Sequence, residues 1–154
     1  MKVREIMSSL DASVSPDSPV SEVARLLIER HLSGIPVVKG NKLAGLITQR
    51  DVVTKHAHVH LPVFIGLIGY VAPFELPGSR DEVERALAVT AGQLMDTDPV
   101  TADVGDDVDD VATLMVDKDV DPIPVMDDGV LVGTISMADI IRLVLVEEGD
   151  GSGG

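Results

Sequence analysis

A hydroxyl and a carboxylate recur at one fixed spacing in two parts of the chain. The pattern is G-x-x-[T/S]-x-x-D, and it occupies residues 45–51 and again residues 133–139. A carboxylate can accept hydrogen bonds from both hydroxyls of a ribose, while a nearby Thr or Ser can hold the 5′ side of the ligand. The same residue types are also the preferred caps of a helix N-terminus. Ribose binding and helix capping are therefore both open for the four residues concerned: Thr48, Asp51, Ser136 and Asp139.

The two motifs belong to a longer internal repeat. A shift of 88 residues brings the two halves into register without a gap, so that Met7 falls on Met95 and the Ile-Pro-Val segment at 35–37 falls on 123–125. Identities of this kind, at hydrophobic or special positions, indicate a duplicated structural unit. A unit of roughly 50 residues is too small to bury its sheet face alone, so we expect the two copies to pack against each other.

Hydrophobic spacing predicts the elements of each copy. Apolar residues recur at helical spacing over residues 20–28, after Ser18, which we expect to cap that helix. Two short strands follow at 35–38 and 43–48, and a closing helix begins near Asp51. The second copy repeats this order. The predicted fold is α+β or α/β, with two β-α-β-β-α repeats packed sheet to sheet as a pseudo-two-fold module.

Four parts of the chain follow from this division. They are a first repeat at 1–56, a linker at 57–90, a second repeat at 91–148 and a flexible Gly-rich tail at 149–154. Within the linker we expect an extended segment at 61–74 and a helix at 79–89. The extended segment is the longest apolar stretch, and it is too short to span a bilayer.

The chain is strongly acidic, with a formal net charge of −14 at pH 7. Eight Lys or Arg stand against six Asp or Glu in residues 1–60, and four against twenty in residues 61–154. Such a surface repels nucleic acids and anionic membranes, so we expect neither as a partner; a patch for a basic partner is the alternative. The excess of Asp and scarcity of Lys resemble halophilic proteins. Without cysteine or an evident signal peptide, the expected location is the cytoplasm.

The two copies resemble the CBS domain, which occurs in pairs as the Bateman module. The resemblance rests on HLSGIPVV at 31–38 and LAGLITQRDVV at 43–53, with DVDPIPVM at 119–126 and LVGTISMADII at 131–141 as their counterparts. It implies a stand-alone, non-catalytic regulatory module that binds an adenosine-type ligand in clefts between the repeats. We expect AMP ahead of ATP, with S-adenosylmethionine as an alternative, and signalling through packing or oligomer changes. The competing hypothesis is a structural or protein-interaction pair with empty clefts.

The resemblance also implies which residues meet the ligand. It gives ribose and phosphate to the two hydroxyl–carboxylate pairs and the adenine to two further sets. The first set is Ala12, Leu32, Ser33, Ile35 and Pro36, and the second is Val100, Val120, Asp121, Ile123 and Pro124. Core packing is also expected of the Ile-Pro pairs in both sets. Asp121, which replaces Ser33 in the second copy, weighs against a phosphate there.

Basic residues for a phosphate are scarce in this pattern, because neither copy places one beside its Ile-Pro segment. The candidates are Arg50, Lys55 and Arg142, with His56, His58 and His60 in reserve. We therefore expect a phosphate-poor adenosine ligand and two sites that are not equivalent. By resemblance we also expect a homodimer formed through the apolar helix faces at 26–28 and 140–146, and a regulated protein that the sequence does not identify.

Metal and catalytic sites find little support in the sequence. The alternating histidines at 56–60 imitate a metal comb but lack a completing acid or thiol, so a polar linker is the better interpretation. The alternating aspartates at 117–121 imitate a calcium loop, but Pro122 stands where that loop needs glycine. No catalytic motif is present, and an enzyme, a resident metal and a required cofactor are all not expected.

Overall fold

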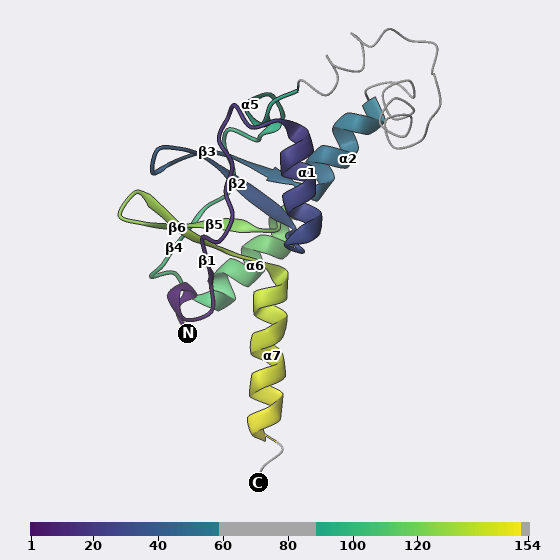
Figure 1. Ribbon diagram of the computed structural model, residues 1–154. Helices are drawn as coiled ribbons and strands as arrows, with labels where there is room; N and C mark the ends of the chain where they lie inside the picture. The colour runs from purple at the N-terminus through teal and green to yellow at the C-terminus, as the bar shows by residue number, and fades with distance from the viewer. Residues whose placement is uncertain (59–88, 152–154) are drawn as a thin grey trace, which may run out of the picture.

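The computed structural model describes residues 1–58 and 89–151 (Figure 1). The first repeat contains α1 (Val20–Glu29), β2 (Gly34–Lys39), β3 (Lys42–Thr48) and α2 (Gln49–His58). The second repeat contains α6 (Val108–Lys118), β5 (Ile123–Asp127), β6 (Val130–Ile135) and α7 (Met137–Gly151). Four short elements lead into these: η1 (Val3–Glu5), β1 (Ser8–Ser9), α5 (Ala91–Leu94) and β4 (Ala102–Asp103). The predicted α+β architecture of two repeats is confirmed.

The 88-residue register extends to irregularities of the backbone. The β2–β3 hairpin has a bulge after Val37, and the β5–β6 hairpin has one after Val125, its counterpart. Shortly after each repeat's first helix an equivalent residue, His31 or Asp119, has a left-handed backbone with φ of 53°. Features of this kind are set by local sequence and packing, so their recurrence indicates that the two repeats share one backbone design.

The segment before each repeat's first helix, here called the lead-in, crosses over and pairs with the other repeat. Residues 8–9 of the first lead-in and Asp96 of the second make these pairs. β1 pairs antiparallel with β6, with Ser8 opposite Thr134, and extends the sheet β1-β6-β5-β4. In the same way Asp96 forms a bridge to Leu46 of β3. Both pairs of partners are related by the 88-residue shift. The sequence predicts a lead-in before each copy, but it does not predict this exchange, which ties the two repeats into one body.

The glycine that opens each G-x-x-[T/S]-x-x-D motif makes room for this crossing. A Cβ atom on Gly45 would lie 2.6 Å from the main-chain oxygen of Asp96. A Cβ atom on Gly133 would collide with the main-chain oxygen of Ser8. Any larger residue would push the crossing strand away. This glycine therefore serves the packing of the lead-in rather than a ligand.

Each repeat has its own hydrophobic core between its sheet and its first helix. The first core includes Val23, Leu27, Ile35, Val37 and Ile47. The second includes Val111, Met115, Ile123, Val125 and Ile135. Burial of one such aliphatic side chain contributes about 1.5–3 kcal/mol, so the two small cores are the main stabilising term of the fold.

Two local predictions at helix ends are wrong. Ser18 does not cap α1, because Pro19 is the residue before the helix and the Ser18 hydroxyl accepts a hydrogen bond from the Ser15 amide at 3.1 Å. The predicted tail starts too early, because α7 continues through Gly149 to Gly151. Extension of an existing helix adds one hydrogen bond per residue, which offsets the cost of about 1 kcal/mol for glycine. Residues 152–154 lie outside the described part.

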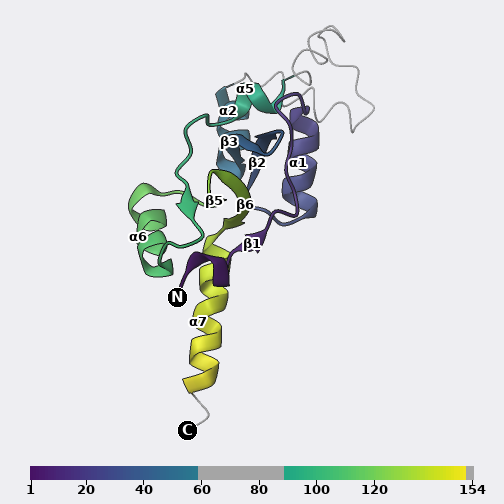
Figure 2. The ribbon, with the colours of Figure 1, turned by 90° about the vertical axis from the view of Figure 1, so that its left-hand side faces the viewer.

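The linker is described only at its two ends. The first repeat's closing helix runs to His58, two residues beyond the predicted boundary, and the backbone of His56 is helical rather than extended. The predicted extended segment at 61–74 and helix at 79–89 lie outside the described residues, except for Val89. Among the described helices none is long and apolar enough to cross a membrane. The turned view of Figure 2 shows that α7 projects away from the rest of the molecule, as it does in Figure 1.

Candidate functional site

Two pockets lie where the repeats meet, and each is built from both repeats. The pocket that contains the second repeat's pair, here the Ser136 pocket, has a volume of about 280 Å³. The pocket that contains the first repeat's pair, here the Thr48 pocket, has a volume of about 450 Å³. Apolar walls come from the opposite repeat in each case. They are Ala12, Leu32 and Pro36 in the Ser136 pocket, and Pro99, Val100 and Val120 in the Thr48 pocket.

Strand and helix geometry bring the hydroxyl and the carboxylate of each pair together. Ser136 follows β6, and Asp139 lies in the first turn of α7. The Asp139 carboxylate accepts hydrogen bonds from the Ser136 amide at 2.9 Å and the Ser136 hydroxyl at 3.1 Å. The Asp139 amide in turn donates to the Ser136 hydroxyl at 3.3 Å. The pair therefore caps α7 while it faces the pocket.

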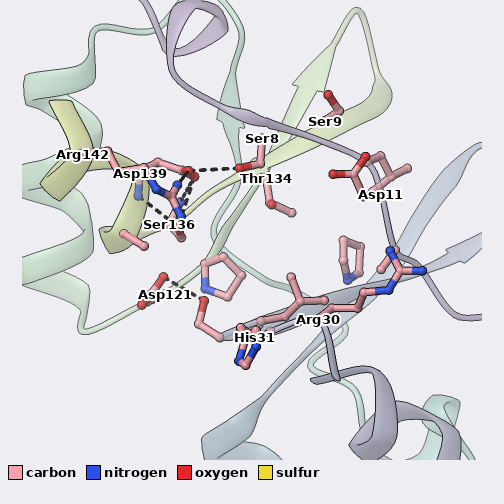
Figure 3. Close-up of a pocket in the computed structure, with 18 residues that line it drawn as sticks. Ser8, Ser9, Asp11, Arg30, His31, Asp121, Thr134, Ser136, Asp139 and Arg142 are labelled. Carbon is pink, nitrogen blue, oxygen red and sulfur yellow. Dashed lines mark hydrogen bonds and ion pairs between the residues drawn. The ribbon is translucent and has the colours of Figure 1, made fainter. Parts of the chain in front are cut away.

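Asp139 is surrounded by donors on its other oxygen as well. Oδ1 accepts from the Ser8 hydroxyl at 3.0 Å and from the Arg142 guanidinium at 2.8 Å (Figure 3). Asp139 is only 5% exposed and is the one buried charged residue among those the structure describes. A carboxylate offers about four acceptor positions, and four donors occupy them here. A ligand hydroxyl that binds Asp139 must therefore replace Ser8 or Arg142.

The Thr48 pocket has the same cap but a less occupied carboxylate. Oδ2 of Asp51 accepts from the Thr48 amide at 2.9 Å, and the Asp51 amide donates to the Thr48 hydroxyl at 3.1 Å. No other donor to the Asp51 carboxylate occurs among the described side chains. The residue that corresponds to Ser8 is Asp96, which brings a second carboxylate instead of a donor. With respect to the described side chains, Asp51 thus keeps acceptor positions for a ligand.

A contact between two equivalent residues marks the pseudo-two-fold axis between the pockets. The Ser33 hydroxyl donates to the Asp121 carboxylate at 3.2 Å, and these two residues are 88 apart in the chain. Both line both pockets. Next to them Gly34 faces its own counterpart, Pro122, and a Cβ on this glycine would lie 2.6 Å from the proline ring. The two repeats touch at this axis, so a change in one pocket can reach the other through Ser33 and Asp121.

The charges of the two pockets differ. The ionisable residues that line the Ser136 pocket are Arg30, Arg142, His31, Asp11, Asp121 and Asp139. Those that line the Thr48 pocket are Arg50, Asp51, Asp96, Asp119 and Asp121. The Arg50 guanidinium binds Asp119 at 2.7 Å across the repeats, and this carboxylate raises the pKa of Arg50. With its one arginine paired, the Thr48 pocket is the more negative of the two.

Most of the predicted site residues line the pockets, and a few do not. Ile35 and Ile123 are fully buried in the two cores, and Pro124 is fully buried beside them; none of the three lines either pocket. For Ile35 and Ile123 the core interpretation holds, because the pleat of β2 and β5 turns both side chains toward the cores. The side chains of Lys55, His56 and His58 and all of His60 lie outside the described part.

Six polar residues that line the Ser136 pocket are not predicted from the sequence: Ser8, Ser9, Asp11, Arg30, His31 and Thr134. Ser8 reaches Asp139 only because the lead-in crosses to the other repeat. Arg30 and His31 line the pocket from the end of α1, which corrects the expectation of no basic residue near the first Ile-Pro segment. The left-handed turn at His31 follows α1 beside the pocket, but a single His does not predict such a turn, so no sequence signal marks these positions. Figure 3 shows Arg30 and Asp11 across the pocket from Asp139 and Arg142.

No group of three or more metal-ligating side chains occurs in the described ranges 1–58 and 89–151. Two of the three aspartates that imitate a calcium loop bind other groups of the chain. Asp119 binds Arg50, and Asp121 accepts from Ser33 and from the Met137 amide at 3.2 Å. The Arg50–Asp119 and Ser33–Asp121 bonds each join one repeat to the other, so the carboxylates at 119 and 121 serve contacts between the repeats.

Two similar proteins each match most of this chain. YhcV of Bacillus subtilis, a CBS domain-containing protein, is 23% identical over 150 residues, which are 97% of this chain and 90% of YhcV. Inosine-5′-monophosphate dehydrogenase of Thermoplasma acidophilum is 27% identical over 130 residues, which are 84% of this chain but only 21% of the dehydrogenase. The chain thus spans about a fifth of that enzyme.

Solved structures with the same fold include two with bound ligands. The crystal structure of CBSX2 in complex with AMP is 20% identical, with a TM-score of 0.71, and covers 96% of this chain and 98% of its own. The CBS domain pair of protein MJ0100, in complex with 5′-methylthioadenosine and S-adenosyl-L-methionine, is 24% identical, with a TM-score of 0.68 and the same coverage. The family model for the CBS domain matches residues 3–58 and 91–146. The chain is therefore a member of the CBS domain family that carries two CBS domains in tandem.

Proposed function

We propose that this chain is a non-catalytic regulatory module that binds an adenosine-type ligand in the two pockets between its repeats. The observation that carries the proposal is the composition of each pocket: a hydroxyl–carboxylate pair from one repeat faces an apolar wall from the other. A flat apolar wall with one polar anchor suits a purine joined to a ribose. Pockets of about 280 and 450 Å³ are of the size that such a molecule needs.

The proposal fits what structures of the same fold contain. CBSX2 was solved with AMP, and MJ0100 with 5′-methylthioadenosine and S-adenosyl-L-methionine. We infer AMP ahead of ATP for this chain, because two further phosphates would add negative charge to pockets that are already rich in aspartate. S-adenosylmethionine, which adds positive charge, is the alternative.

Binding would be coupled to the packing of the repeats through Asp139. A ribose on this carboxylate replaces Ser8 or Arg142, since its acceptor positions are filled in the free protein. Ser8 belongs to the crossing strand β1, and Arg142 belongs to α7, which projects from the body. A ligand that breaks the Ser8 contact would shift the position of β1, and one that breaks the Arg142 contact would shift that of α7. The size of the shift is set by the difference between the ligand's affinities for the two arrangements.

A structural module with empty pockets is the second candidate. The observation in its favour is that both pairs already act as helix caps, and that Asp139 is fully hydrogen-bonded without a ligand. If the two pairs act only as helix caps, the contacts of Ser8 and Arg142 with Asp139 are permanent parts of the fold, and no ligand replaces them. Ligand binding separates the two candidates directly.

We also propose that the module is a cytoplasmic homodimer. α7 carries a row of exposed apolar side chains, of which Ile141, Leu145 and Val146 are 60%, 64% and 62% exposed. The helix face predicted at 26–28 contributes less than expected, because Leu27 is buried in the core and only Ile28 is widely exposed. A second copy of α7 is the occupant that matches this face in length and character.

A thermal-shift titration tests the proposed function. Adenosine, AMP, ATP and S-adenosylmethionine are each added to the purified chain. At a hundredfold excess over Kd a ligand adds about 2.7 kcal/mol, which raises the Tm by about 5–11 °C for a protein of this size. The shift should fall in Asp51→Ala and in Asp139→Ala, while Asp17→Ala, a surface control, should retain it. No shift with any ligand at millimolar concentration would exclude the sensor and leave the structural candidate.

A further inference from the structure

We infer that the two pockets sort adenosine ligands by charge: the Ser136 pocket takes a phosphate-bearing nucleotide, and the Thr48 pocket takes an adenosine derivative without phosphate. This inference rests on the proposed function and names the ligand class of each site. It comes from residue-by-residue comparison of two pockets that are related by the 88-residue shift.

The first difference concerns the arginine nearest to the carboxylate. Arg142 binds Asp139 at 2.8 Å, and its side chain is 70% exposed. Its counterpart in the first repeat is Thr54, which has no charge and does not line the Thr48 pocket. When ribose hydroxyls take over the Asp139 oxygens, the guanidinium is released next to the 5′ side of the ligand. A phosphate there can bind it in place of the carboxylate, often through two parallel hydrogen bonds.

The second difference concerns the lead-in and the turn after the first helix. Ser8 and His31 line the Ser136 pocket, whereas Asp96 and Asp119 hold the equivalent positions in the Thr48 pocket. Each of these exchanges adds a carboxylate to the Thr48 pocket. Arg30 adds a further positive charge to the Ser136 pocket, and it makes no ion pair or hydrogen bond with a described residue through its side chain.

The arginine of the Thr48 pocket does not reverse this balance. Arg50 stands where the Ser136 pocket has Ala138, but its guanidinium binds Asp119 at 2.7 Å. A phosphate would have to compete for it with that carboxylate and would also lie near Asp51 and Asp96. Like charges at such short range disfavour the phosphate and favour a neutral or cationic group, such as a sulfonium.

The two carboxylates also differ in what they offer a nucleoside. Asp51 has one donor to its carboxylate among the described residues, so ribose hydroxyls can bind it without displacing a contact. Asp139 has four donors, so a nucleoside alone must break a contact to bind. A phosphate that engages the released Arg142 offsets that loss. A phosphate group should therefore strengthen binding in the Ser136 pocket and weaken binding in the Thr48 pocket.

Calorimetric titration at low ionic strength tests the sorting with AMP and adenosine as probes. Wild-type protein should bind one AMP with high affinity, and AMP-saturated protein should still bind one adenosine. Arg142→Gln should weaken AMP about tenfold or more, since a charge-assisted contact is lost, and should leave adenosine at the AMP-saturated site unchanged. Asp51→Asn should remove that adenosine site and leave AMP unchanged.

Two matched variants sharpen the result. Arg30→Gln should weaken AMP severalfold, whereas Lys118→Gln, its counterpart that does not line the Thr48 pocket, should have no effect. Thr54→Arg combined with Asp96→Ser gives the Thr48 pocket the residues of the other one, and AMP stoichiometry should rise from one to two. A His already occupies the equivalent left-handed turn, so Asp119→His can be added without new backbone strain.

The inference is overturned if the wild type binds two AMP molecules with equal affinity, or if Arg142→Gln weakens AMP and adenosine by the same factor. Either result would mean that both pockets are adenosine sites blind to phosphate, and the proposed function would stand. Absence of heat with both probes has a different meaning, because it would refute the proposed function together with the sorting.

Discussion

Removal of the Ser8 hydroxyl should destabilise the free protein and at the same time tighten AMP binding. In the free protein this hydroxyl donates to Oδ1 of the buried Asp139 carboxylate at 3.0 Å. If a ribose hydroxyl takes that position, Ser8→Ala removes the competitor before the ligand arrives. Stability and affinity then change in opposite directions, which a simple loss of folding would not produce.

The size of both effects follows from one hydrogen bond. A hydrogen bond to a charged group contributes about 1.5–3 kcal/mol, and Ser8 itself is exposed, so that water can replace part of the contact. We therefore expect a loss of about 1 kcal/mol, which lowers the Tm by about 2–4 °C in a protein of this size. The same energy no longer opposes the ligand, so the Kd for AMP should fall about fivefold.

Urea denaturation and calorimetric titration of the same preparations measure the two effects. Ser9→Ala is the matched control, because Ser9 lines the same pocket and its hydroxyl makes no hydrogen bond to a described residue. This control should change neither quantity. A Ser8→Ala protein that is less stable and also binds AMP more weakly would refute the exchange at Asp139, since Ser8 would then be a ligand contact or a purely structural one.

Three further predictions follow from other contacts. Gly45→Ala should destabilise the fold by about 1–3 kcal/mol in urea denaturation, because its Cβ would lie 2.6 Å from the Asp96 carbonyl oxygen; an unchanged midpoint would show that the crossing strand yields freely. Leu145→Asp, at a side chain that is 64% exposed, should convert the proposed dimer to a monomer in sedimentation equilibrium while the circular dichroism spectrum stays that of the folded chain, and a monomeric wild type would exclude the α7 interface. Lys2 binds Asp107 at 2.9 Å and lowers the pKa of that carboxyl. This pair therefore stabilises the fold fully at pH values above the ordinary Asp pKa of about 3.9. The stabilisation is lost as the pH falls through the lowered pKa of Asp107. The Tm of Lys2→Met should accordingly lie below that of the wild type at pH 7 and approach it on acidification; a gap that widens toward low pH would contradict the pairing.

The repeat and its helices and strands could be predicted from the sequence, because each of them is encoded by nearby residues. Hydrophobic spacing identifies the helix that begins at Val20 and the strands around Ile35 and Ile47, and a duplicated pattern reinforces every assignment. The exact ends of the helices are predicted less well, because the same polar residue can make different local contacts. Side-chain capping by Ser18 competes with its use in a nearby turn, and the structure uses Pro19 as the cap instead.

Contacts between the repeats were beyond the reach of the sequence. The role of Ser8 depends on a crossover that joins residues 124 or more positions apart, and no hydrophobic periodicity indicates which strand β1 will join. Arg30 was missed for a related reason. A basic residue at a helix end is ordinarily solvated, and only the approach of the second repeat turns this position into the wall of a pocket.

Whether adenosine ligands bind between the repeats can be seen in a crystal structure of the chain grown with saturating AMP. We expect AMP in the Ser136 pocket, with its ribose hydroxyls on Asp139, its base against Leu32 and its phosphate on a released Arg142. The Arg142–Asp139 and Ser8–Asp139 contacts should both be broken. Crystals in saturating AMP that keep both contacts and hold no nucleotide in either pocket would contradict ligand binding between the repeats.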